Sequence, residues 1–145
     1  MADTIIIPTC GKIKELELIL GKDLAENLTL KLFTNDADVA SAPADLVAGS
    51  FTEMTTHGYV AKTLTMATWD TPTLASTKAV SQYDAGSAVQ WTFTAAVSVN
   101  VYGYYVVMAT TGTLLWACKF ETAKPIANAG ETISVIPEKR YTQSA

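Results

Sequence analysis

Alternating apolar and polar positions predict a long β-hairpin over residues 99–121, VNVYGYYVVMATTGTLLWACKFE. Side chains of a strand point to opposite faces in turn, so each arm should place one row in a core. The two rows expected in the core are Val99, Val101, Gly103, Tyr105 and Val107 on the outgoing arm, and Leu114, Trp116, Cys118 and Phe120 on the return arm. Residues 110–112, Thr-Thr-Gly, supply the turn, since glycine adopts positive φ without strain.

The outgoing arm is apolar on its second face as well. The residues of this face are Tyr102, Tyr104, Val106 and Met108. A strand with two apolar faces either lies in the centre of a covered sheet or presents its outer face to another protein. Both alternatives stay open at the level of the sequence.

Residues 12–26, KIKELELILGKDLAE, are the one stretch with clear helical periodicity. Ile13, Leu16, Leu20 and Leu24 recur at helical spacing and form one narrow apolar stripe. Gly21 ends or bends the helix, because glycine inside a helix costs about 1 kcal/mol relative to alanine. We expect the helix to cover an open end or face of the sheet, with docking on a partner as the alternative.

The N-terminal arm, residues 1–9, carries three consecutive isoleucines, Ile5, Ile6 and Ile7, followed by Pro8. Isoleucine side chains are costly to leave in water. We expect an edge strand of this domain, where proline is tolerated, with packing on a neighbouring molecule as the alternative. At the other end, residues 138–145 form a polar tail that we expect to be frayed and flexible.

Further short strands are expected between turn segments rich in glycine, asparagine, aspartate or proline. Their ranges are 28–34, 51–64 as two strands around His57 and Gly58, 76–83 at an edge, 88–94 and 131–137. About eight mostly antiparallel strands in 145 residues predict a single all-β domain over residues 1–145. We expect an antiparallel β-sandwich of jelly-roll type with one N-terminal helix; an immunoglobulin-like sandwich is the alternative.

Composition narrows the range of partners. The formal net charge is −4 and charged residues make up 17%, which argues against binding a nucleic-acid backbone. No basic segment followed by a long apolar run begins the chain, and the most apolar segment is too short to span a bilayer. We therefore expect a product that is made and kept in the cytoplasm, or assembled into something there, without membrane contact.

The residues that usually carry chemistry form no recognisable constellation. The carboxylates are scattered, and neither a glycine-rich phosphate loop nor a nucleophile motif is present. Cys10 and Cys118 are expected to be free thiols, and with the single His57 they lack the spacing of a zinc site. We expect no enzymatic activity, no metal or cofactor and no small-molecule substrate.

Several segments in order carry a family resemblance. They are LTLKLF at 28–33, FTE at 51–53, YGYYVV at 102–107, GTLLWA at 112–117 and ANAGETI at 127–133. With these segments the chain resembles a family of small β-sandwich proteins of tailed bacteriophages. Cys118 stands where that family often has an acidic residue.

The resemblance implies a virion structural protein without enzymatic activity. It points to a capsid decoration or cement protein that contacts the major capsid protein and copies of itself, most often as a homotrimer. The alternatives are a tail-fibre or fibre-adaptor component and a carbohydrate-binding β-sandwich module. The candidate interface residues are Ile5, Ile6 and Ile7 of the arm and Tyr102 and Tyr104 of the second strand face.

Overall fold

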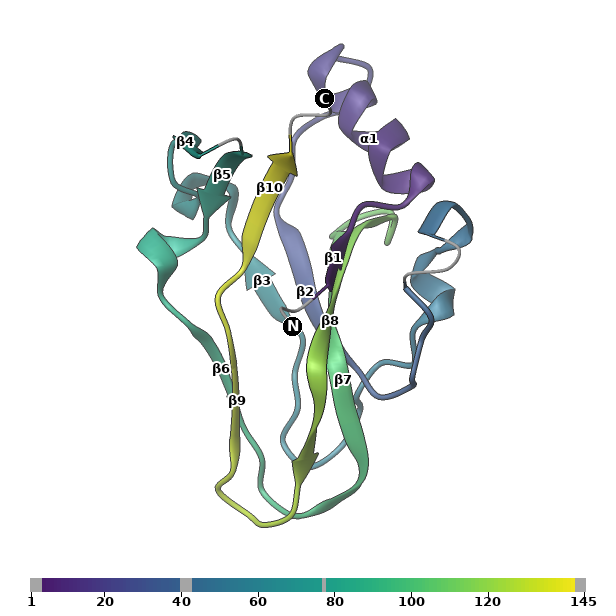
Figure 1. Cartoon of the computed structure of the whole chain (residues 1–145), viewed down its shortest axis with the longest axis vertical. Helices are drawn as coiled ribbons and strands as arrows, with labels where there is room; N and C mark the ends of the chain where they lie inside the picture. Colours follow the sequence, from purple (N-terminus) through teal and green to yellow (C-terminus); the bar gives the residue numbers. More distant parts are fainter. Residues whose placement is uncertain (1–3, 40–42, 77, 143–145) are drawn as a thin grey trace.

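Antiparallel strands form most of the regular secondary structure in a computed structural model, which describes residues 4–39, 43–76 and 78–142 (Figure 1). The strands are β1 (Thr4–Ile6), β2 (Leu28–Phe33), β3 (Lys62–Leu64), β4 (Thr73–Ala75), β5 (Lys78–Gln82), β6 (Val89–Thr92), β7 (Val97–Met108), β8 (Leu114–Ile126), β9 (Thr132–Val135) and β10 (Glu138–Thr142). The α-helix α1 (Thr9–Ile19) precedes β2, and four short 3-10 helices lie in connections: η1 (Pro43–Asp45), η2 (Ala48–Ser50), η3 (Met66–Thr68) and η4 (Asp84–Gly86). The predicted class, mostly antiparallel β with a helix near the N-terminus, is confirmed.

The strands form three sheets. A five-stranded sheet has the order β1-β8-β7-β2-β3, a three-stranded sheet has the order β10-β5-β4, and β6 pairs with β9. The described residues therefore contain ten strands, where the sequence predicts about eight. The long β7–β8 hairpin lies in the centre of the large sheet. Its predicted turn is confirmed, because Gly112 has φ 70° and its N–H donates to the Met108 carbonyl at 2.9 Å.

A β-bulge in β8 interrupts the predicted alternation. Val106 pairs with Trp116 but Val107 pairs with Leu114, so Leu115 is an extra residue on β8. As a result Leu115 and Trp116 lie in one core, whereas Leu114 lies in the other. The prediction that Leu114 shares a row with Trp116 is therefore wrong.

A second register shift lies between Val101 and Gly103, where two steps along β7 face five steps along β8, from Lys124 to Lys119. Val101 packs in the same core as Tyr104, although the two residues are three apart in the chain. Tyr105 lies in the opposite core. The predicted row that joined Val101 to Tyr105 therefore ends at this irregularity, because an odd shift in register changes which face of the sheet the following side chains occupy.

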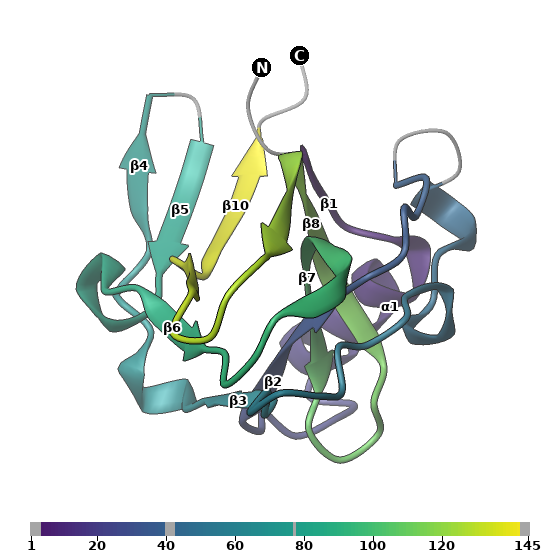
Figure 2. The same ribbon diagram turned by 90° about the horizontal axis from the view of Figure 1, so that it is seen from below.

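The first core lies between the five-stranded sheet and the two smaller sheets, which face the same side of it (Figure 2). Trp91 and Phe93 reach this core from β6 and the residue after it, and they are 2% and 1% exposed. Val89 packs against the same core. The predicted inward row of residues 88–94 is thus confirmed.

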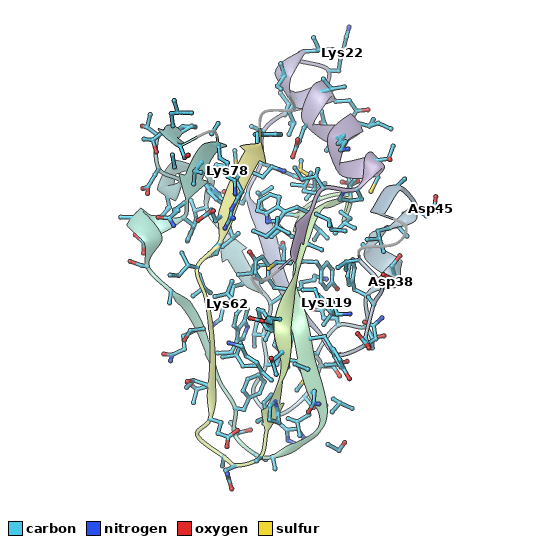
Figure 3. The ribbon with its side chains drawn as sticks, in the orientation of Figure 1. Lys22, Asp38, Asp45, Lys62, Lys78 and Lys119 are labelled. Carbon is cyan, nitrogen blue, oxygen red and sulfur yellow. The ribbon has the colours of Figure 1, made fainter. Side chains whose placement is uncertain are left out.

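The second core covers the opposite face of the large sheet with side chains from residues 35–39 and 43–51 of the same chain. Phe51 stacks on Tyr105 with ring centroids 5.0 Å apart, and Val39 is 2% exposed. The Lys119 ammonium donates to the Ala37 carbonyl at 3.0 Å and fastens this segment to β8. Figure 3 labels Asp38 and Asp45, which belong to these covering residues, on the same side of the molecule as Lys119 of β8. The β7 strand is therefore central, and its second face is covered within the same chain.

The prediction for the N-terminal arm is confirmed, whereas the prediction for the C-terminal tail is wrong in part. The arm is the expected edge strand: β1 pairs with β8 through Ile5↔Cys118 and Ile6↔Ala117. The expectation of a frayed tail is wrong for residues 138–142, because β10 pairs with β5 over five residues. Residues 143–145 lie outside the described part of the chain. The predicted edge strand at 76–83 is also corrected, since β5 lies between β10 and β4.

Helix α1 begins earlier and ends sooner than the predicted range 12–26. It starts after Pro8 and ends at Leu20, where a Schellman motif closes it: the Gly21 N–H donates to the Leu18 carbonyl and the Lys22 N–H to the Glu17 carbonyl. Gly21 has φ 67°, which glycine adopts without strain. Among the described residues, no helix has the length and apolar character needed to cross a membrane.

Candidate functional site

Helix α1 sits on the backbone of β8 through a glycine. A Cβ atom on Gly11 would lie 2.2 Å from the Leu115 carbonyl oxygen, so any larger residue would push the helix away. Cys10 lies beside this contact, and its thiol donates to the carbonyls of Leu46 and Leu114. The close approach of a helix to a strand end is thus encoded by one residue without a side chain.

The predicted apolar stripe of this helix faces solvent. Ile13 and Leu16 are 54% and 57% exposed, and Leu20 and Leu24, which follow the helix, are 67% and 84% exposed. The expectation that this stripe covers the sheet is wrong. Successive residues of a helix are rotated by about 100°, so Ile13 and Leu16 lie roughly 200° and 140° around the helix axis from Gly11. The side of the helix that carries Gly11 therefore faces β8, and the apolar stripe faces solvent.

A pocket of about 250 Å³ opens beside α1, at the end of the first core. Its wall consists mainly of apolar side chains from distant parts of the chain: Leu18, Leu28, Met66, Trp69, Leu115 and Trp116. Figure 1 shows α1, the start of β8 and β10, which all contribute residues to this wall, in the upper part of the molecule. The bulge described above contributes to this wall, because it places Leu115 and Trp116 on the same face.

An ion pair closes one side of the pocket. The Lys139 ammonium on β10 pairs with the Glu15 carboxylate on α1, and the Tyr141 hydroxyl donates to the same carboxylate. The ammonium also lies over the Trp116 ring, 4.8 Å from its centroid. Burial lowers the pKa of Lys139, and the Glu15 carboxylate opposes this shift by stabilising the charged form.

Two tryptophans of the wall have buried indole N–H groups without hydrogen-bond partners among the described residues. Trp69 and Trp116 meet edge to face, with ring centroids 5.9 Å apart and an interplanar angle of 71°. Both Nε1 atoms are buried, and neither has a hydrogen-bond partner among the described residues. An unpaired buried donor costs roughly 1–3 kcal/mol, so this wall is not optimised for stability alone.

The interface residues expected from the sequence have mixed outcomes. Ile5 and Ile7 pack partly against the first core, and Ile6 packs against the second. Tyr104 is only 4% exposed and offers no surface to a partner, which corrects the prediction for this residue. Tyr102 packs partly against the second core, on the other face from Tyr104, because of the register shift in β7.

The residues considered for metal chemistry are separate. Neither Cys10 nor Cys118 belongs to a disulfide bond, in line with the thiols expected from the sequence. His57 lies in a turn with φ 58°, followed by Gly58 with φ 84°. Within the described ranges, no group of three or more histidine, cysteine, aspartate or glutamate side chains could hold a metal ion.

Sequence reasoning did not find the pocket. Its members come from α1 and the segment after it, from η3 and the residue that follows it, and from β2, β5, β7, β8 and β10. The sequence predicts a frayed tail where β10 lies. The only signal in the sequence is that Trp69 lies outside any expected strand. Comparisons of the chain with protein-family models, with curated proteins and with solved structures found no match.

Proposed function

We propose that this chain is a structural subunit of a tailed-phage particle, a capsid decoration or cement protein that binds the major capsid protein and associates with copies of itself. One observation carries the self-association: Ile13 and Leu16 of α1 and its C-cap residue Leu20, which belong to the apolar stripe, are each more than half exposed. The resemblance of the sequence supplies the phage context, the homotrimeric state, the virion location and the jelly-roll topology as further parts of the proposal.

The sequence suggested the second face of β7 as the surface for self-association, and we now assign this role to the apolar stripe instead. On the second face of β7, Tyr104, Val106 and Met108 are buried in the first core. The opposite face of the strand is covered by side chains from residues 35–39 and 43–51. By contrast, fully burying a leucine or isoleucine side chain gains roughly 1.5–3 kcal/mol, so pairing the stripe of one copy with another supplies a substantial drive for association. A subunit that binds only the assembled shell then stabilises that shell by linkage.

A carbohydrate-binding module is less well supported. Stacking on sugar rings needs exposed aromatic faces. Among the large hydrophobic side chains that the described residues expose, Tyr141 is the one aromatic residue, at 48%. Trp91 and Trp116 are 2% and 3% exposed. The aromatic residues therefore serve the cores and the pocket rather than an open platform.

Sedimentation velocity of the purified chain tests the self-association. We expect a concentration-dependent oligomer, a monomer for Leu16→Glu, and unchanged association for the control Leu74→Glu, whose residue is 79% exposed on β4. A monomer at all concentrations, or equal loss in both variants, contradicts the role of the stripe.

Labelling of the chain in micrographs of purified particles tests the virion location. We expect the label at regular positions on the head. A label on tail fibres would replace the decoration role by the fibre alternative, and a particle without label would refute both.

A further inference from the structure

We propose that the pocket beside α1 binds a small, neutral, two-ring aromatic molecule. Two other depressions, of about 380 and 420 Å³, have walls to which polar and apolar atoms contribute comparably. Both also contain Glu138 and Arg140, which pair with each other. The pocket beside α1 differs, because its wall is almost entirely apolar. Concave apolar surfaces of this kind are the usual sites of small-molecule binding.

The size of the pocket sets the size of the ligand. An apolar cavity of about 150 Å³ accommodates one benzene ring. The pocket beside α1 has about 250 Å³, which leaves room for a second fused ring but not for a long flexible ligand. A two-ring molecule also loses little conformational freedom on binding, which favours affinity at this small size.

The side chains of the wall favour a ligand that is aromatic. Trp69 and Trp116 already contact each other edge to face, and a flat ring extends this arrangement. Met66 and Met108 line the same pocket, and thioethers adapt to and attract aromatic rings. The wall therefore suits a planar ring better than a branched aliphatic molecule.

The charged residues of the wall favour a ligand that is electrically neutral. Its charged residues are Glu15, Glu26 and Lys139. Glu15 and Lys139 pair with each other, and Glu26 accepts hydrogen bonds from the Thr110 amide and hydroxyl. A charged ligand would lose its hydration without gaining a free counter-ion, which is strongly unfavourable in apolar surroundings.

Indole serves as the neutral probe and indole-3-acetate as its charged counterpart, each titrated into the whole chain and followed by ¹H–¹⁵N correlation spectra. We expect saturable shifts with indole, which include the side-chain N–H signals of Trp69 and Trp116, and at least tenfold weaker binding of indole-3-acetate. Equal binding of the two probes, or shifts that rise linearly without saturation, would overturn the proposal.

Variants then locate the binding. Ala25 is an exposed residue of the pocket wall, so Ala25→Phe fills the opening without disturbing a core. Ala75→Phe on β4 adds the same group at another exposed alanine, outside this pocket. We expect at least tenfold weaker indole binding for Ala25→Phe and a change below twofold for Ala75→Phe. Unchanged binding in Ala25→Phe would refute the location.

Discussion

The contact between α1 and β8 can be tested by replacing Gly11 with alanine. This substitution has two effects of opposite sign on the free energy of unfolding: a gain in helix propensity and a clash with the backbone of β8. Gly11→Ala should stabilise an isolated helix by about 1 kcal/mol, since alanine has the higher helix propensity. In the folded chain the added Cβ would lie 2.2 Å from the Leu115 carbonyl oxygen, 2.9 Å from its carbonyl carbon and 3.1 Å from the Leu114 carbonyl oxygen. These are backbone atoms inside a sheet, which do not yield as a flexible side chain does.

The distances decide which effect wins. A tolerable contact needs a separation above about 3 Å, so α1 must move away from β8 by about 1 Å, against a close-packed interior. Overpacking of this kind costs about 1–3 kcal/mol, which exceeds the gain in propensity. We therefore expect Gly11→Ala to lower the free energy of unfolding by about 1–2 kcal/mol. The displaced helix would also weaken the thiol hydrogen bonds of Cys10.

Urea denaturation followed by far-UV circular dichroism measures the effect, as a lower midpoint at an unchanged slope. Gly49→Ala is the matched control, because Gly49 lies in η2 and a Cβ atom added there would point into open space. We expect the control to differ from the original chain by less than about 0.5 kcal/mol. A Gly11→Ala chain as stable as the control would show that α1 does not rest on β8 as described.

Two further predictions concern pH. Burial raises the pKa of Tyr59 and Tyr104 and raises that of Tyr105 to about 12, so the folded chain keeps phenolic protons that the unfolded chain releases above about pH 10. The stability from these groups is complete below that pH and is lost as pH rises further. The phenolate absorbance of these three of the six tyrosines should therefore appear together with the loss of circular dichroism, and ionisation of all six in the folded state would contradict this. The side chain of Asn128 lowers the pKa of Glu131, as does the Ala127 N–H, so Glu131 stabilises the fold above its unfolded pKa and this contribution disappears as pH falls. Glu131→Gln should flatten the decline of thermal stability on the acid side, and an unchanged slope would refute its role.

Short patterns of apolar and polar residues are enough to predict the elements whose structure depends mainly on residues close to them in the sequence. The β7–β8 hairpin needs only alternation and a glycine that tolerates positive φ at its turn. The inward row of β6, with Trp91 and Phe93, follows from the same period of two. Proline after three isoleucines predicts an edge strand in the arm, and β1 pairs with β8 there.

The parts that failed depend on distant contacts. The bulge at Leu115 leaves no trace in the local pattern, because leucine suits either face of a sheet covered on both sides. Strand β10 was missed because the segment from Glu138 to Thr142 is polar, and its pairing with β5 supplies backbone hydrogen bonds that composition does not reveal. The pocket depends on both features, so it could not be predicted from either stretch alone.

The reversed orientation of α1 links the two candidate sites. A helix normally turns its apolar stripe to the core, because that burial is the main source of its stability in a protein. Here the inward face carries Gly11, Glu15 and Leu18, and these residues give backbone contact, an ion pair with Lys139 and one apolar contact. The same rotation leaves Leu16 exposed and places Leu18 at the pocket wall. A helix turned the usual way would insert leucines where Gly11 meets β8, so the exposed stripe and the open pocket are two consequences of one close contact.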